Sequence, residues 1–202
     1  MKKEGEKARK IIKIVIIFTF LYMILFAGIS IYRKNYEFMF YIVFVSLIII
    51  LLAFLRRKIH LPVYLIVALS LLGLLHFAGG NVFIQGARLY DQVFFNGAIR
   101  YDQVVHALGS FLFVFLGYNL LSKYLDDRIK KNAFLLPFLL VLLGLGFGAF
   151  YEIVELFGVV FFGGGKGVGT YINNAVDLVY NTIGAIIASM IIFRYNKKLD
   201  RN

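Results

Sequence analysis

The sequence contains no cysteine. This absence excludes disulfide bonds, thiolate metal ligands and cysteine nucleophiles, and it leaves the redox compartment undetermined. Charged residues are also scarce, at 16% of the chain, whereas hydrophobic residues make up 61%. The mean hydropathy is +0.82, and a soluble domain of this length would be only ~45–50% apolar. The composition therefore places the chain outside the soluble class.

Long uncharged apolar runs recur along the 202 residues, and each run is long enough to span a bilayer as a helix. We predict an all-α fold, a six-helix transmembrane bundle in which residues 1–202 form a single integral membrane domain. The predicted spans are 11–32, 38–55, 60–79, 103–122, 133–160 and 173–193. Residues 1–58 are expected to form lipid-facing scaffold helices, and residues 60–193 a core that carries polar side chains. The first apolar run is longer than the core of a secretory signal and lacks a small-residue cleavage site, so it is interpreted as an uncleaved span.

The net charge of +11 reflects topology rather than a nucleic-acid partner. Seventeen basic residues fall on one side of the predicted spans: Lys2, Lys3, Lys7, Arg9, Lys10, Lys13, Arg56, Arg57, Lys58, Lys123, Arg128, Lys130, Lys131, Arg194, Lys197, Lys198 and Arg201. Only five fall on the other: Arg33, Lys34, Arg88, Arg100 and Lys166. Positive loops stay inside the cell, so both termini are expected in the cytoplasm. Anionic lipid headgroups on that side are the expected partners of the basic loops, together with the bilayer itself.

Two loops on the outer side have distinctive sequences. The longest connection, 81–101, holds the tetrapeptide Tyr-Asp-Gln-Val at 90–93, and the same tetrapeptide follows at 101–104. A local repeat in a hairpin-like loop is plausible, although matches this short also arise by chance. The segment Gly163–Gly169 is rich in glycine but lacks the Gly-Lys-Ser/Thr ending and the preceding strand of a phosphate-binding P-loop. A flexible linker is the favoured interpretation.

Polar and small residues recur every three or four positions in the last three spans, so each set lies along one face of its helix. The stripes consist of Asp102, His106, Gly109, Phe113 and Gly117 in the fourth span, Gly144, Gly148, Glu152 and Glu155 in the fifth, and Asn173, Asp177, Asn181, Gly184 and Ala188 in the sixth. Small residues at four-residue spacing allow helices in lipid to approach closely. We therefore expect the three stripes to face one another.

The predicted topology brings the ionisable members of these stripes, and His76 at the end of the third span, to a similar outer depth. The expected cluster contains His76, Asp102, His106, Glu152, Glu155, Asn173, Asp177 and Asn181. Ionisable groups in a bilayer are costly unless they are paired, hydrated or bound to metal, and they mark functional sites. Arg100 and Arg88 are the only nearby cations expected. Carboxylate and imidazole ligands on helices suit zinc, manganese or iron, and the metal hypothesis uses Asp102, His106, Glu155 and Asp177 as ligands.

Structural roles remain open for several of these residues. Either histidine can serve only to hydrogen-bond a neighbouring helix. The asparagines at 173, 174 and 181 are typical of helix caps and of contacts between helices. Asp102 can cap the fourth helix beside Arg100. Glu152 and Glu155 are harder to explain structurally, because two acids on one face of a buried helix have no packing role by themselves.

The segment from Arg100 to Ser189 resembles two related sets of bacterial and archaeal membrane proteins, the VanZ-like family and the uncharacterised YjdF-type family. The matching motifs are Arg-Tyr-Asp-Gln-Val-Val-His at 100–106, Tyr-Glu-Ile-Val-Glu at 151–155, and Asp177-x3-Asn181-x2-Gly184, preceded by His-Phe-Ala-Gly-Gly at 76–80. VanZ-like proteins tend to have glutamine where this chain has Glu155, so the YjdF-type match is closer. The resemblance implies a polytopic protein of a prokaryotic inner or plasma membrane with unsettled activity. VanZ-like members are associated with glycopeptide resistance, but nothing in these residues transfers that role.

Three functions are compatible with the sequence. The first is a membrane-embedded enzyme in which a metal-activated water attacks a lipid-linked or cell-envelope substrate, with Glu152 as general base. The second is a transporter that couples protons or cations through the same acids. It predicts polar residues reaching the cytoplasmic side, and the inner halves of the stripes are instead small and apolar. The third is a structural protein whose polar cluster only fixes helix packing. Substrate, metal identity and oligomeric state lie beyond the sequence.

Overall fold

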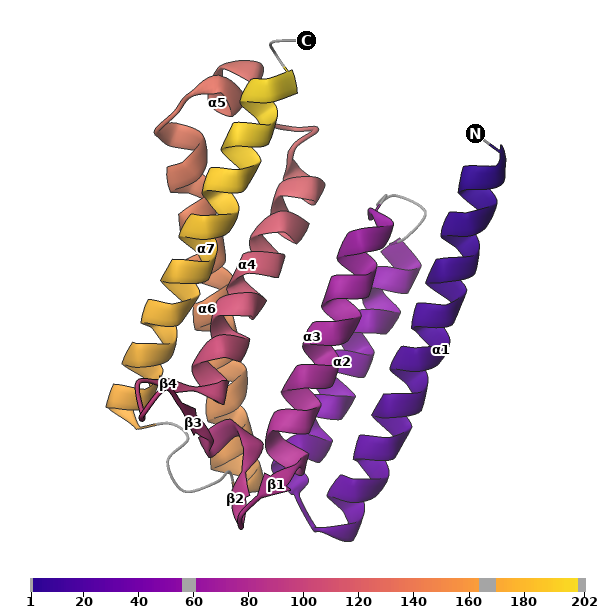
Figure 1. Ribbon diagram of the computed structural model, residues 1–202, viewed down its shortest axis with the longest axis vertical. Coiled ribbons are helices and arrows are strands. Elements are labelled where there is room, and N and C mark those ends of the chain that lie inside the picture. The colour runs from indigo at the N-terminus through magenta and orange to yellow at the C-terminus, as the bar shows by residue number, and fades with distance from the viewer. Residues whose placement is uncertain (1, 56–60, 164–169, 200–202) are drawn as a thin grey trace. The chain divides into compact units, whose positions relative to one another are not determined.

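A computed structural model describes residues 2–55, 61–163 and 170–199. Its long helices are α1 (Lys2–Tyr32), α2 (Tyr36–Leu55), α3 (Val63–Asn81), α4 (Tyr101–Leu121), α6 (Leu135–Phe162) and α7 (Tyr171–Leu199) (Figure 1). A short helix, α5 (Asp127–Lys131), lies between α4 and α6. The all-α prediction is confirmed, because the strands found in the described ranges form only two small hairpins.

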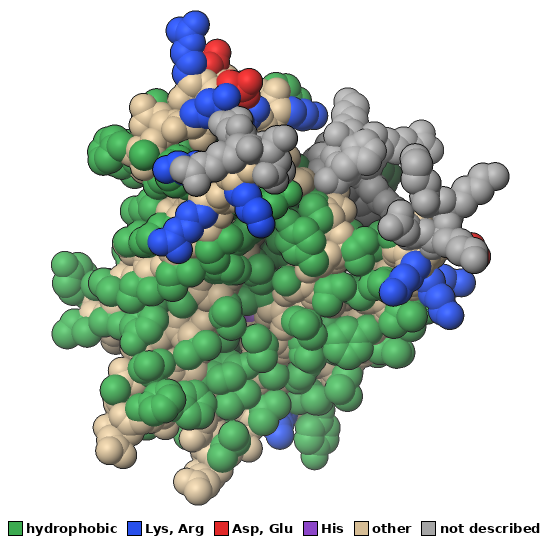
Figure 2. Space-filling model, turned by 45° about the horizontal axis from the view of Figure 1, so that its top comes forward, with side chains coloured by type: hydrophobic (Ala, Val, Ile, Leu, Met, Phe, Trp, Pro, Cys, Tyr) green, Lys and Arg blue, Asp and Glu red, His purple; other side chains and the backbone are tan. Residues whose placement is uncertain are grey.

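Each predicted span corresponds to one long helix. Five of these helices, α1, α3, α4, α6 and α7, are long and apolar enough to cross a membrane. The helix α2 is a shorter apolar helix over Tyr36–Leu51 among the described residues. The predicted second span, at 38–55, and with it the total of six spans, therefore stays a prediction. Hydrophobic side chains make up most of the visible surface (Figure 2). Of the glycine-rich loop expected at 163–169, residues 164–169 lie outside the described ranges.

The chain divides into two compact units. Unit 1 extends to Tyr101 and includes the end of α6 from Phe157, while unit 2 covers Asp102–Leu156 and α7. The third helix therefore clusters with the first two, although the sequence grouped it with the polar core. The expected division into a scaffold at 1–58 and a core at 60–193 stays a prediction.

In unit 1, α1 and α3 are joined by polar side chains within their apolar faces. The hydroxyl oxygens of Thr19 and Ser70 lie 2.6 Å apart, and the hydroxyl of Tyr22 donates to the carbonyl of Ser70 at 3.0 Å. Farther along, Ser30 donates to the side-chain oxygen of Asn81 at 2.8 Å. Hydrogen bonds between helices satisfy polar groups that lipid cannot. The opposite face of α1 remains exposed, as Phe20 at 64% shows, which suits contact with lipid.

Two antiparallel hairpins connect α3 to α4. Strand β1 (Phe83–Ile84) pairs with β2 (Ala87–Arg88), and β3 (Val93–Phe94) pairs with β4 (Ile99–Arg100). In the first hairpin both turn residues, Gln85 and Gly86, have positive φ angles of 52° and 83°, which is typical of a two-residue hairpin turn. The repeated tetrapeptides fold differently. The first begins in a 3-10 helix, η1 (Leu89–Asp91), and the second begins α4.

In unit 2, an apolar core fills the half of the helices that lies away from the start of α4. It consists of Val114, Leu136, Leu140, Ala185, Ala188 and Ile192. Near the C-terminal end of α7, Tyr118 donates to the side-chain oxygen of Asn196 at 2.9 Å. The helix α5 lies beside this end of α7 (Figure 1). The basic residues of α5 and those that end α7 therefore share one end of unit 2.

Candidate metal centre

The candidate site is built around His106 on α4, entirely within unit 2. Asp102 lies in the first turn of α4, and a residue four positions later faces the same side of a helix. The Nε2 atom of His106 consequently lies 3.5 Å from an Asp102 carboxylate oxygen. His106 is buried at 4% exposure, whereas the Asp102 side chain keeps 18% of its surface exposed. The pair thus reaches from the protein interior toward its surface.

Helix α6 supplies a second carboxylate to the opposite edge of the imidazole. The Oε1 atom of Glu152 lies 3.5 Å from Nδ1 of His106. Glu155 follows on the same helical face, and its ligand atoms group with those of His106 and Glu152. The ring of Tyr151 meets the His106 ring edge-on at 5.2 Å between centroids. The imidazole is therefore fixed in orientation by groups from both helices.

Helix α7 contributes Asp177 and Asn181, again four residues apart, and both are buried. The side-chain amide nitrogen of Asn181 lies 3.4 Å from Nδ1 of His106. One turn before Asp177, Asn173 donates a hydrogen bond to an Asp177 carboxylate oxygen. Asn173 thereby holds a carboxylate on its own helix, which is neither the helix cap nor the contact between helices considered from the sequence.

Small residues bring the helices close enough for these contacts. A Cβ atom added at Gly148 on α6 would lie 2.6 Å from the Asn181 amide nitrogen. At Gly184 on α7 it would collide with the backbone carbonyl oxygen of Ala107 on α4. At Gly144 it would lie 2.5 Å from the Cβ atom of Ala185. Glycines at these positions allow the close approach that the spacing of the stripes predicts.

Two overlapping groups of ligand atoms result, each with its members within 4.8 Å of one another. The first comprises Asp102, His106 and Asp177, and the second comprises His106, Glu152 and Glu155. Metal–ligand bonds are ~2.0–2.2 Å long, so two ligands of one ion lie ~3–4 Å apart and small side-chain movements suffice to bind an ion. The arrangement is thus compatible with a divalent cation bound by either group.

Several polar atoms at this site have no hydrogen-bond partner among the described residues. They are Nε2 of His106, Oγ of Ser110 and both carboxylate oxygens of Glu152. A buried polar atom that is left unpaired costs about 1–3 kcal/mol, so proteins pair such atoms with water, an ion or a ligand. Ser110 lies four residues after His106, on the same face of α4. It was not predicted from the sequence, because a serine in a membrane span usually hydrogen-bonds the backbone of its own helix.

His76 belongs to unit 1 and has its own surroundings there. Its Nδ1 atom is hydrogen-bonded to the hydroxyl of Tyr90, and its ring packs against Phe38, Tyr41 and Phe77. Tyr90 lies in the 3-10 helix η1, so this hydrogen bond joins His76 to another segment of unit 1. Its place in the cluster with His106 stays a prediction.

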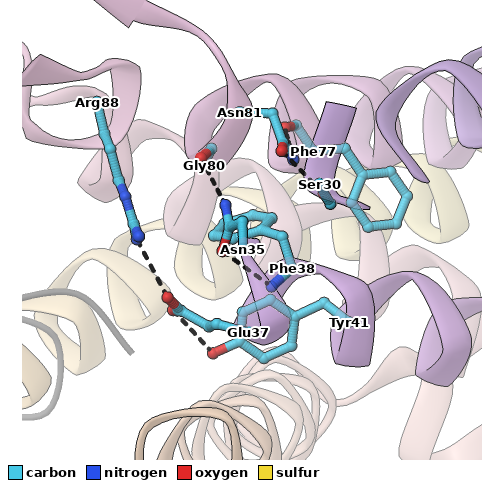
Figure 3. A network of polar contacts seen from close by, with 9 residues as sticks. All are labelled: Ser30, Asn35, Glu37, Phe38, Tyr41, Phe77, Gly80, Asn81 and Arg88. Carbon is cyan, nitrogen blue, oxygen red and sulfur yellow. Dashed lines mark hydrogen bonds and ion pairs between the residues drawn. The ribbon is translucent and has the colours of Figure 1, made fainter. Parts of the chain in front are cut away.

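A buried ion pair in unit 1 was also missed. Arg88, considered as a counter-ion for the cluster, instead lies 3.1 Å from a carboxylate oxygen of Glu37 on α2 (Figure 3). Glu37 is buried at 3% exposure, and Tyr41 donates to its other oxygen at 3.3 Å. The predicted second span began at residue 38, so Glu37 lay just outside it. Glu37 opens α2 immediately after a basic turn, which made it look like a loop residue.

One family model matches the chain over residues 12–198, and its description reads "Predicted membrane protein" (DUF2238). The chain belongs to this family. The match covers every helix that carries the candidate site, and it supports an integral membrane protein with several apolar helices. It does not bear on the resemblance to VanZ-like and YjdF-type proteins, which stays a prediction. None of the curated proteins matches the chain, and none of the solved structures does.

Proposed function

We propose that this DUF2238 protein is a metal-dependent hydrolase of the membrane, with one divalent cation bound at His106. The observation that supports it is the meeting of one buried imidazole with carboxylates from three helices, within 4.8 Å in each ligand group. Zinc, manganese and iron suit such nitrogen and oxygen donors. The proposed substrate is a lipid-linked or cell-envelope molecule, because the ligands lie within membrane helices.

The proposed ligands are Nε2 of His106, Asp102 and Asp177. Nε2 is chosen because it has no hydrogen-bond partner among the described residues, whereas Nδ1 faces both Asn181 and Glu152. A metal-binding histidine usually directs its other nitrogen to a carboxylate or carbonyl, which fixes the ring. The proposed partner of Nδ1 is Oε1 of Glu152, 3.5 Å away, which leaves Oε2 for proton transfer. Three protein ligands leave a coordination position for water, as catalytic zinc sites do. Glu155, a ligand in the hypothesis from the sequence, belongs to the other group, with His106 and Glu152.

Glu152 is the proposed general base. Its Oε1 atom faces His106, and its Oε2 atom has no hydrogen-bond partner in the described chain. A metal lowers the pKa of bound water and polarises the substrate carbonyl or phosphoryl oxygen. Glu152 lies at the Nδ1 edge of the ring, so it would take the proton of that water through one intervening water as the oxygen attacks, and would return the proton to the leaving group as the scissile bond breaks.

Transport is less well supported. A through-pathway for protons or cations requires polar groups along the remaining length of α4, α6 and α7. That part of unit 2 is instead filled by an apolar core in which Val114, Leu136 and Ala185 are fully buried. The proposed topology places the basic end of unit 2, and both chain termini, in the cytoplasm of a prokaryotic cell. The site would then face the outer leaflet.

The metal content of purified protein tests the proposal. After incubation with zinc, manganese or iron and removal of excess metal, wild-type protein is expected to retain one ion per chain, measured by inductively coupled plasma mass spectrometry. His106→Ala is expected to retain none. His76→Ala is the matched control, since it removes a histidine that is also buried but lies in unit 1, and it should retain the ion.

A lipid assay tests the reaction itself. Wild-type protein loaded with metal is incubated with the polar lipids of the host membrane, and water-soluble and lipid products are identified by mass spectrometry. Products are expected only with wild-type protein and only with metal. If wild-type protein binds no ion, the metal site is refuted. If an ion binds but reconstituted liposomes show Glu152-dependent cation flux and no products, transport replaces hydrolysis.

A further inference from the structure

A second polar site lies in unit 1, where α1 turns into α2. A pocket of about 150 Å³ opens there. Its lining includes Arg33, Lys34, Glu37, Phe83, Arg88 and Phe162. All of these residues belong to unit 1, and none takes part in the proposed metal centre.

The charges of this pocket favour an anion. Three of its side chains are cationic, Arg33, Lys34 and Arg88, and Glu37 is the one carboxylate among the described lining residues. Glu37 pairs with Arg88 at 3.1 Å, which leaves an excess of two positive charges. A pocket with low-dielectric walls strengthens the attraction that such an excess exerts on an anion.

The two arginines are held in place by other contacts. A terminal nitrogen of Arg33 donates to the backbone oxygen of Asn81 at 2.6 Å, and its guanidinium carbon lies 4.7 Å from the centre of the Phe83 ring. Arg88 is held by Glu37, as Figure 3 shows. A guanidinium carries five N–H donors, so each arginine keeps donors for a ligand. Ordered arginines of this kind bind phosphate oxygens with fixed geometry.

The pocket lies at the ends of membrane helices. The helix α1 ends at Tyr32, α2 begins at Tyr36, and α6 ends at Phe162. The ends of spanning helices lie at the depth of the lipid headgroups. The rim also exposes apolar rings, with Phe83 at 46% and Phe162 at 41%. A cationic pocket with an apolar rim at headgroup depth matches the chemistry of a phospholipid, whose phosphate adjoins its acyl chains.

We propose that this pocket binds a phosphate group, supplied by the headgroup of a membrane phospholipid. Arg33 and Lys34 make the principal contacts, and Arg88 contributes the donors that Glu37 does not use. The site is independent of the metal centre, so loss of one does not predict loss of the other.

Lipid binding to purified protein tests the proposal. The full chain in a neutral detergent is titrated with dioleoylphosphatidylglycerol, and bound lipid is measured by native mass spectrometry. A charge near the headgroup contributes about 1 kcal/mol, or about fivefold in affinity. Lys34→Gln is therefore expected to weaken binding about fivefold, and Arg33→Gln with Lys34→Gln about twentyfold or more. The double variant Lys7→Gln with Lys10→Gln removes the same charge from the N-terminal part of α1 and should change binding less than about twofold.

Two other ligands identify the source of the phosphate, and a variant that should fold normally shows that a loss of binding is not caused by misfolding. Dioleoylglycerol, which lacks phosphate, is expected not to bind, and inorganic phosphate is expected to bind far more weakly than the phospholipid. Inorganic phosphate that binds as tightly, with the same dependence on Arg33, would keep the phosphate site but assign it a soluble ligand. Lys34 has an exposed side chain, so Lys34→Gln should fold normally. Equal phospholipid binding by wild type, Lys34→Gln and the Arg33 and Lys34 double variant overturns the proposal, as does equal binding of dioleoylglycerol.

Discussion

Gly148 on α6 lies directly against the side-chain amide of Asn181 on α7, so that a Cβ atom at position 148 would come within 2.6 Å of the amide nitrogen. The same nitrogen lies 3.4 Å from Nδ1 of His106. The missing side chain at 148 therefore sets the position of an asparagine that contacts the central histidine. Packing between α6 and α7 is coupled to the geometry of the candidate site.

Gly148→Ala is expected to weaken metal binding at the candidate centre. The added methyl group would displace the Asn181 side chain, and its contact with His106 would then be lost. Misplacing a group that orients a metal ligand typically costs about 10- to 100-fold in affinity. Gly146→Ala is the matched control, since a Cβ atom there meets nothing within 4 Å. Zinc affinity by competition with a chelating dye measures both variants. Equal affinities for the two would show that Asn181 does not support the site.

Glu152→Gln and Asp177→Asn are expected to separate the two roles proposed for carboxylates. Asp177→Asn replaces a ligand and should abolish stoichiometric metal. Glu152→Gln should retain the ion but lower the rate of product formation by about 10²- to 10⁴-fold, the usual contribution of a general base. Metal content and turnover are measured on the same preparations. If Glu152→Gln and Glu155→Gln lose the ion while Asp177→Asn keeps it, the ion binds at the Nδ1 edge of His106 instead.

The polar cluster has a purely structural role if these substitutions change only stability. In that case Asp177→Asn would lower the melting temperature while wild-type protein binds no ion and forms no product. The melting curve of each variant, followed by circular dichroism in detergent, is therefore recorded beside its metal content.

Gly184→Ala is expected to destabilise unit 2. Its Cβ atom would collide with the backbone carbonyl oxygen of Ala107, and backbone cannot move aside as a side chain can. Forced overpacking of this kind costs about 1–3 kcal/mol. Gly146→Ala again serves as control and should stabilise its helix slightly, because alanine has a higher helix propensity than glycine by about 1 kcal/mol. Unfolding in mixed micelles of increasing denaturing detergent content measures both.

Arg88→Met is expected to destabilise unit 1, because it leaves the carboxylate of Glu37 buried without its 3.1 Å partner. Losing a hydrogen bond to a buried charge costs roughly 2 kcal/mol, and the partial exposure of Arg88 keeps the value below that of a fully buried pair. Adding Glu37→Gln to Arg88→Met should recover part of the lost stability, since the buried side chain at position 37 is then uncharged.

An exposed ion pair provides the control for this comparison. Lys130 lies 3.3 Å from Asp127, whose side chain is 78% exposed. Exposed pairs contribute only about 0–1 kcal/mol, so Lys130→Met should leave the unfolding transition nearly unchanged. A loss as large as that of Arg88→Met would indicate that charge removal, and not burial, governs the effect.

The helices were predictable because lipid leaves a backbone few alternatives. Continuous apolar runs must satisfy their own hydrogen bonds, so runs such as 103–122 fold as helices, and α4 (Tyr101–Leu121) agrees with that expectation. Spacing also placed Asp102 beside His106, since neighbours on one helix face are fixed by the helical repeat. The two hairpins between α3 and α4 were harder to predict from the sequence, because their strands contain only two residues each.

The partners of residues far apart in the sequence were not predictable from any local pattern. Arg88 was considered as a counter-ion for the acids of the later helices, yet it pairs with Glu37, 51 residues away. The hydrogen bond between His76 and Tyr90 was likewise not foreseen, whereas the grouping of His76 with His106 stays a prediction. Both contacts depend on which segments pack together. The helices have apolar surfaces of similar composition, so the sequence does not show which of them are neighbours.

The sequence by itself determined that this is a membrane protein with acids and a histidine on the inner faces of its last helices, because composition and helical periodicity are local properties. Only the tertiary structure decided which edge of the His106 ring meets each carboxylate, with Asp102 near Nε2 and Glu152 near Nδ1. That choice depends on the rotation and separation of α4, α6 and α7. Glycines at 144, 148 and 184 set those quantities by allowing close contact between helices.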